Sequence, residues 1–537
     1  MVTGSQKSEV RSQKDGNKIF LKFIFLPFVF CLILLACSTV EERNEASEPN
    51  KGQFTLFLNG PDKVSVDVSF NLSAVNIVSE DGASKEVMNT PLSINSLNMT
   101  GRQVLLGEKS LPEGRYKKLK FVIKDATVKR KERASTLSLP AEAVEAEINI
   151  DIKRQQNTSL FINWNADASI RDGYSFNPAF NIKGQSPELS TSLIYVTNED
   201  SNNVSVINRQ SGNVVATVMV GKKPRGVAAL IGRERLKVYV ANSGSNSISV
   251  IDPTTNRVEG EAPIRFGSEP EGLAAASLPS GKELIFVTNY KTNSVSVVDT
   301  STLQEIEKID VGRGPIAAAA DPAIETLTGS RFLSFEEVNI IKGFREKFLN
   351  VYVVNQNSNT VSVIMIDVLT GRAGEVVNLN VEWRPRALAV DYQRGKVYVA
   401  NYNSDKLSVI DILQVIKGNL AGAVSTINNV GTSITGVVAE PAFDRIYLLK
   451  ELSGEVTIIK PVTETAADPL KPVMPPIMGT IAVEDSPRSF ILDPELRKLY
   501  VVNRGSNNIS VIDKTTKRPE RVIPVGMKPY GIAMFPK

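Results

Sequence analysis

The sequence predicts an all-β protein in which an N-terminal β-sandwich is followed by a seven-bladed β-propeller that the C-terminal strand closes. The first observation is a phrase, YVTNEDSNNVSVIN at residues 195–208, that returns in near-copies as far as LYVVNRGSNNISVID. Its asparagine position recurs at intervals of 44, 47, 66, 46, 49 and 53 residues, and such periods built from short strands are typical of propeller blades. The second observation is the period-2 alternation of apolar residues in 53–185, which is typical of half-buried strands.

Length and charge set the limits of this prediction. A chain of 537 residues is too long for one ordinary core, so we expect two or more domains. The composition, 42% hydrophobic and 22% charged, is that of a globular protein. A net charge of only +4 argues against the broad basic surface on which nucleic-acid binding depends.

The absence of histidine restricts the chemistry most. The chain has none, which removes the usual general base, haem ligand and catalytic zinc ligand. The two cysteines, Cys31 and Cys37, both lie in the N-terminal apolar segment, so the folded part has no disulfide and no thiolate metal site. We therefore expect no metal, no cofactor and no catalytic residue.

Residues 1–36 are predicted to be a lipoprotein signal peptide. Five basic residues precede an apolar run at 23–36, which is too short to span a bilayer. The sequence LLACS around Cys37 resembles a bacterial lipobox, and this resemblance implies that Cys37 is lipidated and becomes the first mature residue. The serine at position 38 implies the outer membrane under the enteric sorting rule. An uncleaved anchor helix is the alternative, and 37–52 is expected to be a solvated tether.

Residues 53–185 are predicted to form a β-sandwich of about seven strands. Apolar alternation marks FTLFL, KVSVDVSFNLSAVNIV, KKLKFVI, AEINIDI and SLFINW as strands. The stretches LPEGRYKKLKFVI, SLFINWNADASI and the closing FNP resemble an uncharacterised sandwich domain common in bacterial lipoproteins, which implies no activity. Trp164 and Tyr116 are expected in its core, with ligand stacking as the alternative.

Residues 190–537 are predicted to form the propeller. Each copy holds an Ala/Gly-rich strand, the YVTN strand, the VSVID strand and a strand ending near Val-Gly. The small residues suit the innermost strand, where strands converge on the axis. The first copy lacks an inner strand, and the terminal PYGIAMF is an inner strand with nothing after it, so we expect the C-terminus to complete the first blade.

These phrases closely resemble the YVTN family of β-propeller repeats. The resemblance covers about 345 residues of this chain, and it implies a seven-bladed propeller used mostly for binding or scaffolding. Lys450 and Lys460 stand where other copies have Asn and mostly Asp, and Ile434 stands where a proline is usual. These departures break any symmetric site.

The repeated polar residues invite a catalytic interpretation. A serine or threonine recurs in the third strand, but a nucleophilic serine needs a base, and no histidine supplies one. We expect a small side chain there to let adjacent blades approach. The repeated asparagines are expected to be turn residues that tolerate left-handed geometry.

Non-repeated residues are the better candidates, because function need not obey the repeat. The loops before the inner strands read GKKPRG, GSEPEG, GRGPIA, EWRPRA, GTSITG, EDSPRS and GMKPYG. They place Arg225, Glu271, Arg386, Arg488 and Tyr530 at equivalent positions, near the mouth of the central channel. Such a set is able to bind an anionic ligand, a carboxylate or a phosphate. The alternative is that these charges are solvated or paired with one another.

The opposite face is expected to carry insertions. In SFEEVNIIKGFREKFL, Ser334 and Glu337 form a capping-box pattern, and apolar residues from Phe335 to Phe348 follow helical spacing. Residues 411–422 and 460–478 lengthen the same face. These segments pack on the propeller rim or dock the sandwich or a partner protein.

The leading functional hypothesis is a monomeric, lipid-anchored protein of the bacterial cell envelope. Its propeller is predicted to bind or scaffold a protein partner or a small anionic ligand without catalysis. The alternative is a propeller hydrolase, lactonase or quinoprotein-like enzyme, with Glu271 as the carboxylate of a hydrolase. Single-stranded nucleic-acid binding ranks last, because acidic residues are scattered among the basic loop residues.

Overall fold

The protein is described by a computed structural model. The described residues are 50–535 without 132, 140, 142, 187, 233–235 and 462–475. The signal segment, Cys37 and the predicted tether up to residue 49 lie outside them. No helix in the described part of the chain has the length and apolarity needed to cross a bilayer.

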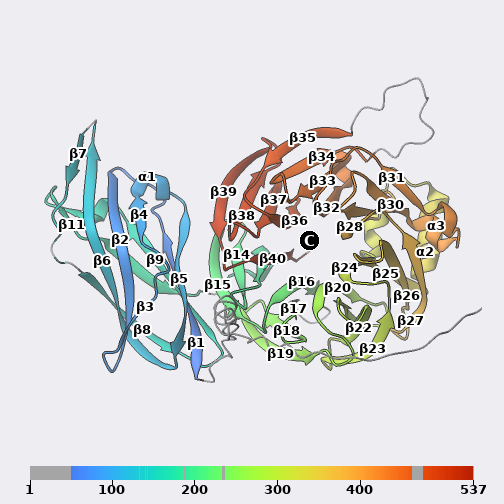
Figure 1. The fold of residues 1–537 in the computed structure, drawn as a ribbon, viewed down its shortest axis with the longest axis horizontal. Coiled ribbons are helices and arrows are strands. Elements are labelled where there is room, and N and C mark those ends of the chain that lie inside the picture. Colours follow the sequence, from blue (N-terminus) through green and yellow to red (C-terminus); the bar gives the residue numbers. More distant parts are fainter. Residues whose placement is uncertain are drawn as a thin grey trace, which may run out of the picture. The chain divides into compact units, whose positions relative to one another are not determined.

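Two sheets form the N-terminal sandwich (Figure 1). The first sheet runs in the order β12-β9-β1-β5: β1 (Lys51–Asn59), β5 (Gln103–Pro112), β9 (Asn157–Asn165) and β12 (Ala179–Gly184). The second contains β2 (Asp67–Ser79), β3 (Ser84–Glu86), β4 (Leu92–Asn95), β6 (Gly114–Arg130), β7 (Arg133–Thr136) and β8 (Ala143–Ile152). Smaller elements are α1 (Ser96–Met99), η1 (Asp167–Ser169), β10 (Ile170–Arg171) and β11 (Ser175–Phe176).

The expectation of about seven strands was too low, because the two sheets hold four and six strands. The sequence interpretation missed β5, whose apolar residues alternate poorly, and β12, which follows a proline. The core prediction is confirmed for both aromatic residues. Trp164 and Tyr116 are both buried. Trp164 donates a hydrogen bond to Ser169 Oγ at 3.0 Å, and Tyr116 donates one to the carbonyl of Pro112 at 3.1 Å.

Seven four-stranded sheets form the propeller, as predicted. Blade 1 contains β13 (Leu193–Asn198), β14 (Asn203–Asn208), β15 (Asn213–Met219) and β40 (Pro529–Met534). Blades 2 and 3 contain β16 (Pro224–Ile231), β17 (Leu236–Asn242), β18 (Ser247–Asp252), β19 (Arg257–Pro263), β20 (Pro270–Ser277), β21 (Glu283–Asn289), β22 (Ser294–Asp299) and β23 (Gln304–Asp310). Blades 4 and 5 contain β24 (Pro315–Ala320), β25 (Phe348–Asn355), β26 (Thr360–Asp367), β27 (Ala373–Asn380), β28 (Pro385–Asp391), β29 (Lys396–Asn401), β30 (Leu407–Asp411) and β31 (Val424–Ile427). Blades 6 and 7 contain β32 (Ile434–Glu440), β33 (Arg445–Lys450), β34 (Glu455–Ile459), β35 (Ile477–Ala482), β36 (Pro487–Asp493), β37 (Lys498–Asn503), β38 (Asn508–Asp513) and β39 (Arg518–Pro524).

The C-terminal strand closes the ring. β40 is antiparallel to β13, with Ile194 opposite Met534 and Tyr195 opposite Ala533, and it takes the inner position of blade 1. Figure 1 shows β40, in red, in the same blade as the green strands β14 and β15. The two ends of the propeller are thus joined in one sheet, as the unpaired PYGIAMF predicted.

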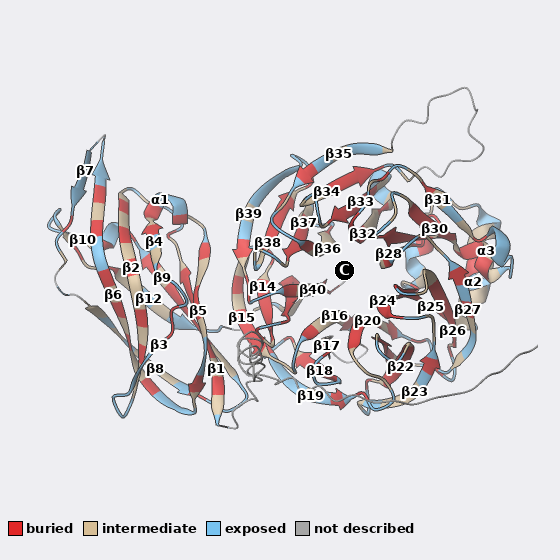
Figure 2. Ribbon diagram, viewed as in Figure 1, coloured by how far each residue is buried: buried red, intermediate tan, exposed pale blue. Residues whose placement is uncertain are grey.

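Burial follows the order of strands within each blade. The second strands are almost wholly buried, and their tyrosines are among the largest side chains of the core. The outer strands, β19 for example, are mostly exposed on the rim, as the blue segments of Figure 2 show. The Ala-rich inner strands lie between the channel and these buried strands.

The repeated asparagines do not have the structure that we predicted. Those that end the second strands are buried, and each donates through Nδ2 to the serine seven residues later, at 2.9 Å from Asn198 to Ser205. The left-handed geometry falls four residues further on, at Asn202, Asn246, Asn293, Asn359 and Asn507. The recurrent serine therefore accepts a hydrogen bond in addition to being small.

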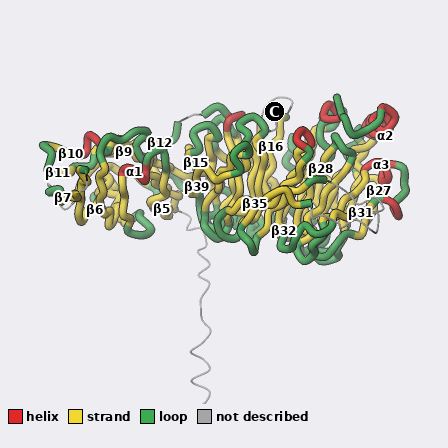
Figure 3. The backbone as a smooth tube through the Cα atoms, turned by 90° about the horizontal axis from the view of Figure 1, so that it is seen from above, coloured by secondary structure: helices red, strands yellow, loops and turns green. Residues whose placement is uncertain are grey.

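Two of the three predicted insertions contain short helices, among them α2 and α3 (Figure 3), whereas most of the third, 462–475, lies outside the described residues. The insertion after β24 contains η3 (Ile324–Leu327) and α2 (Phe335–Arg345), and the one after β30 contains α3 (Ile412–Ile416) and η4 (Leu420–Gly422). Outside the insertions, η2 (Ser190–Ser192) precedes β13 and η5 (Pro441–Phe443) connects β32 to β33. The capping box of Ser334 and Glu337 is confirmed. The predicted apolar face is only partly correct, because Phe335 is 83% exposed, Ile341 is buried, and Phe348 opens β25.

The described sandwich and propeller belong to one compact unit of residues. Gln103 of β5 exchanges two hydrogen bonds with the backbone of Val214 in β15, at 2.9 and 3.1 Å. Asn157 of β9 donates to the carbonyl of Thr217 at 2.9 Å. One alternative from the sequence was that the insertions dock the sandwich. These hydrogen bonds instead join the sandwich to the outer strand of blade 1.

Candidate functional site

Each inner strand begins with the same turn at the mouth of the channel. The residue just before the first position of the strand has a positive φ in all seven blades: Lys223, Glu269, Gly314, Arg384, Ser433, Ser486 and Lys528. In five blades the amide of this residue donates to the left-handed asparagine of the previous blade, at 2.8 Å from Lys223 to Asn202 for example. Because the turn is repeated, the second residue after the positive-φ position occupies an equivalent place in every blade.

These side chains form what we call the mouth ring. From blade 1 to blade 7 it consists of Tyr530, Arg225, Glu271, Ile316, Arg386, Thr435 and Arg488. All five predicted site residues therefore belong to it. They line one pocket of about 340 Å³ together with Glu269, Tyr290, Ile316 and Gln356.

A second ring surrounds the first, and the sequence analysis missed it. It consists of the residue after each strand-ending asparagine or lysine: Glu199, Ser243, Tyr290, Gln356, Tyr402, Glu451 and Arg504. Each backbone amide of this second ring donates to the carbonyl of the left-handed residue in the mouth turn, at 3.0 Å from Glu199 to Lys528. The sequence did contain a sign of this second ring. The residue that follows the strand-ending asparagine differs from copy to copy, although the asparagine itself is nearly constant.

One side of the mouth is a closed network of charges. Arg225 pairs with Glu199 at 2.8 Å and with Glu271, and Glu199 also pairs with Arg504 at 2.6 Å. Tyr530 donates to the second oxygen of Glu271 at 3.1 Å and accepts a hydrogen bond from Arg488. Both oxygens of Glu271 are therefore occupied by protein donors.

The other side of the mouth has two arginines that are not neutralised by an ion pair within the described part of the chain. Among the described residues, neither Arg386 nor Arg488 forms an ion pair with a carboxylate. Arg386 lies over the Tyr402 ring at 4.5 Å, and its buried Nε has no hydrogen-bond partner within the described chain. Arg386 is only half-buried, but its buried Nε lacks an acceptor and the like charge of Arg488 lies nearby, so this side of the pocket favours a bound anion.

The positive charges around the mouth contribute to two pKa shifts. Burial lowers the pKa of Arg386 from its ordinary value, and the like charge of Arg488 lowers it further. Burial alone would raise the pKa of Tyr530, but the positive charges of Arg488, Arg225 and Arg386 outweigh burial and lower it. Both shifts indicate an electropositive mouth, in which negative charge is stabilised.

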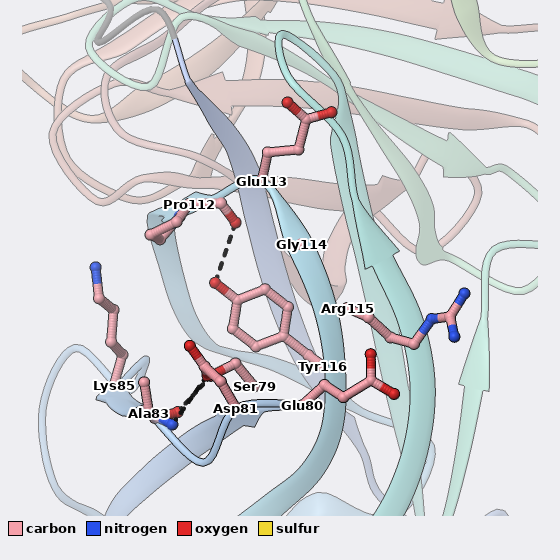
Figure 4. Close-up of a pocket in the computed structure, with 10 residues that line it drawn as sticks. All are labelled: Ser79, Glu80, Asp81, Ala83, Lys85, Pro112, Glu113, Gly114, Arg115 and Tyr116. Carbon is pink, nitrogen blue, oxygen red and sulfur yellow. Dashed lines mark hydrogen bonds between the residues drawn. The ribbon is translucent and has the colours of Figure 1, made fainter.

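A second pocket lies in the sandwich. It has a volume of about 410 Å³ and lies between the turns at 79–85 and 112–116 (Figure 4). Several of its polar groups are bonded to the protein: Arg115 pairs with Asp151 at 3.2 Å, and Tyr116 donates to the carbonyl of Pro112 at 3.1 Å. Asp81 accepts from the amide of Ala83 within its own turn. These groups stabilise turns, and among the described residues no acidic cluster able to hold a metal ion is present here or elsewhere.

Comparisons with known proteins identify parts of this architecture. Residues 51–182 match the family described as "Domain of unknown function (DUF4382)". No curated protein matches the chain. Similar solved structures include hydrazine synthase of Kuenenia stuttgartiensis (19% identity, 60% of this chain and 92% of that one, TM-score 0.46). Others are a functionally unknown protein from Desulfotomaculum acetoxidans (12% identity, 64% and 100%, TM-score 0.49) and a putative 6-phosphogluconolactonase of Bacteroides fragilis (16% identity, 65% and 99%, TM-score 0.45). At such identities the likeness concerns the fold alone.

Proposed function

We propose that this protein is a lipid-anchored envelope protein of the YVTN repeat family whose propeller binds a small anion at the channel mouth without transforming it. The observation that carries the proposal is the pair Arg386 and Arg488, which line the pocket without a carboxylate partner among the described residues. Two convergent guanidinium groups recognise carboxylates and phosphates through charge-assisted hydrogen bonds. The sequence analysis also considered that the mouth charges pair with one another. This is the case for Arg225, which forms ion pairs with Glu199 and Glu271.

The geometry does not favour the hydrolase alternative. A general base must accept a proton from substrate or water, and both oxygens of Glu271 already accept hydrogen bonds from Arg225 and Tyr530. The sequence has no histidine to replace it. The pocket therefore supports binding better than catalysis.

Anion binding is tested by isothermal titration with glucuronate, acetate and inorganic phosphate at constant ionic strength. We expect the wild type to bind at least one of them, and the double variant R386Q/R488Q to bind it ~10-fold or more weakly, since a hydrogen bond to a charged group contributes about 1.5–3 kcal/mol. The matched control is R313Q, because Arg313 is exposed in the mouth loop of blade 4. A wild type that binds none of the three, or a double variant that binds as tightly as R313Q, would contradict the proposed function.

The lipid anchor is tested separately with the two cysteines. We expect the wild type to incorporate labelled palmitate and to sediment with membranes, and C37S to do neither, because two or more acyl chains are needed for stable anchoring. C31S is the matched control and is expected to behave as the wild type. A C37S protein that keeps its full mass and still sediments with membranes would favour the uncleaved anchor helix.

A further inference from the structure

The pocket at the mouth is also lined by polar groups from blades 3 and 4. Gln356 follows β25 in blade 4, is only 9% exposed, and lines the pocket. Its backbone amide is held by the carbonyl of Gly314 at 2.9 Å, but its side-chain amide forms no hydrogen bond among the described residues. The amide therefore has two donors and an acceptor available to a ligand in the pocket.

Two further residues extend this polar lining. Glu269 lines the pocket from the mouth turn of blade 3, where its only described ion pair is with Lys291 at 3.6 Å. The Tyr290 ring also lines the pocket, and its hydroxyl accepts from Asn357 at 3.2 Å. Together these groups provide an amide, a carboxylate acceptor and an aromatic face, which suit hydroxyl groups on a compact ring.

The remaining lining limits both the size and the polarity of a ligand. Ile316 is the one aliphatic side chain among the described residues that line the pocket, so an apolar ligand would leave many polar groups without partners. The volume of about 340 Å³ is near the lower end for small-molecule pockets, which favours a ligand of the size of one sugar ring.

We infer that the ligand is a polyhydroxylated carboxylate, of which a hexuronic acid is the simplest cyclic member. Its carboxylate binds Arg386 and Arg488, and its hydroxyls bond to Gln356 and Glu269. This inference rests on the proposed anion-binding function and narrows it: the arginine pair selects the charge, and Gln356 selects the hydroxylated ring.

The test compares three matched probes by isothermal titration: glucuronate, glucose without the charge, and cyclohexanecarboxylate without the hydroxyls. We expect the wild type to bind glucuronate ~10-fold more tightly than cyclohexanecarboxylate, since each hydrogen bond contributes about 0.5–1.5 kcal/mol. In Q356L the glucuronate affinity is expected to fall ~5-fold or more, from the loss of that bond. The cyclohexanecarboxylate affinity should not change, which also reports that the pocket is intact.

The outcomes separate the two proposals. Equal affinities of the wild type for the two carboxylates, or an unchanged glucuronate affinity in Q356L, would overturn the assignment to a hydroxylated acid and leave anion binding in place. Glucose bound as tightly as glucuronate would overturn the role of the arginines and therefore both proposals.

Discussion

Replacing Phe535 with alanine is expected to lower the free energy of unfolding by about 3–5 kcal/mol, the usual cost of a large buried aromatic. Phe535 follows the closing strand β40, is only 2% exposed, and packs edge-on against Tyr195 of β13 with ring centroids 6.2 Å apart. It belongs to a core cluster that joins blades 1 and 2. The loss should appear as a lower urea midpoint with an unchanged m-value in unfolding followed by circular dichroism.

The control is M527A, because Met527 lies in the same terminal segment but is 54% exposed. That variant should unfold within about 0.5 kcal/mol of the wild type. Deleting residues 529–537 removes the whole strand and exposes the edge of β13, so this variant should unfold at still lower urea and self-associate. A truncated protein that remains a monomer with the wild-type midpoint would contradict closure by β40.

Replacing Glu440 with glutamine is expected to cost about 3–5 kcal/mol, because it leaves the buried ammonium of Lys514 without its counter-charge. Glu440 ends the inner strand of blade 6, and Lys514 follows the third strand of blade 7; both side chains are 6% exposed. Tyr447 donates to the other oxygen of Glu440 at 2.8 Å. Arg209 of blade 1 and Asp493 of blade 7 form the equivalent pair at 3.0 Å, so such pairs join successive blades.

The double variant E440L/K514M should recover most of the loss, since it removes both charges from the interior. K118M provides the control, because the pair of Lys118 and Glu145 is partly exposed and such pairs contribute about 1 kcal/mol or less. If E440Q were as stable as K118M in the same urea titration, the pair would not hold blades 6 and 7 together.

The propeller could be predicted from the sequence because each blade repeats the same local rules. Regular spacing of the strand-ending asparagines gave the number of blades, and small residues identified the inner strands. The first copy of the repeat lacks an inner strand and the chain ends in an extra inner strand, PYGIAMF, which indicated that the C-terminus closes the ring. The sandwich was harder to predict, because strands such as β3 and β7 are short and exposed, and their pairing with β2 and β6 depends on tertiary contacts.

The five predicted site residues could be found because the loop register is repeated, so equivalent positions must lie around one axis. Their partners could not be predicted. That Glu271 is occupied by Arg225 and Tyr530 depends on how far side chains reach from one blade to another, which no local pattern encodes. Gln356 was missed because site candidates were taken only from the loops before the inner strands, whereas Gln356 follows a second strand.

A crystal structure of the whole protein soaked with glucuronate tests the central claim most directly. The account predicts one ring in the pocket at the channel mouth, with its carboxylate within hydrogen-bond distance of both Arg386 and Arg488 and a hydroxyl bonded to Gln356. Glucuronate bound elsewhere on the protein would contradict this prediction. So would a crystal soaked at saturating glucuronate in which the pocket is empty and Arg386 pairs with Glu451.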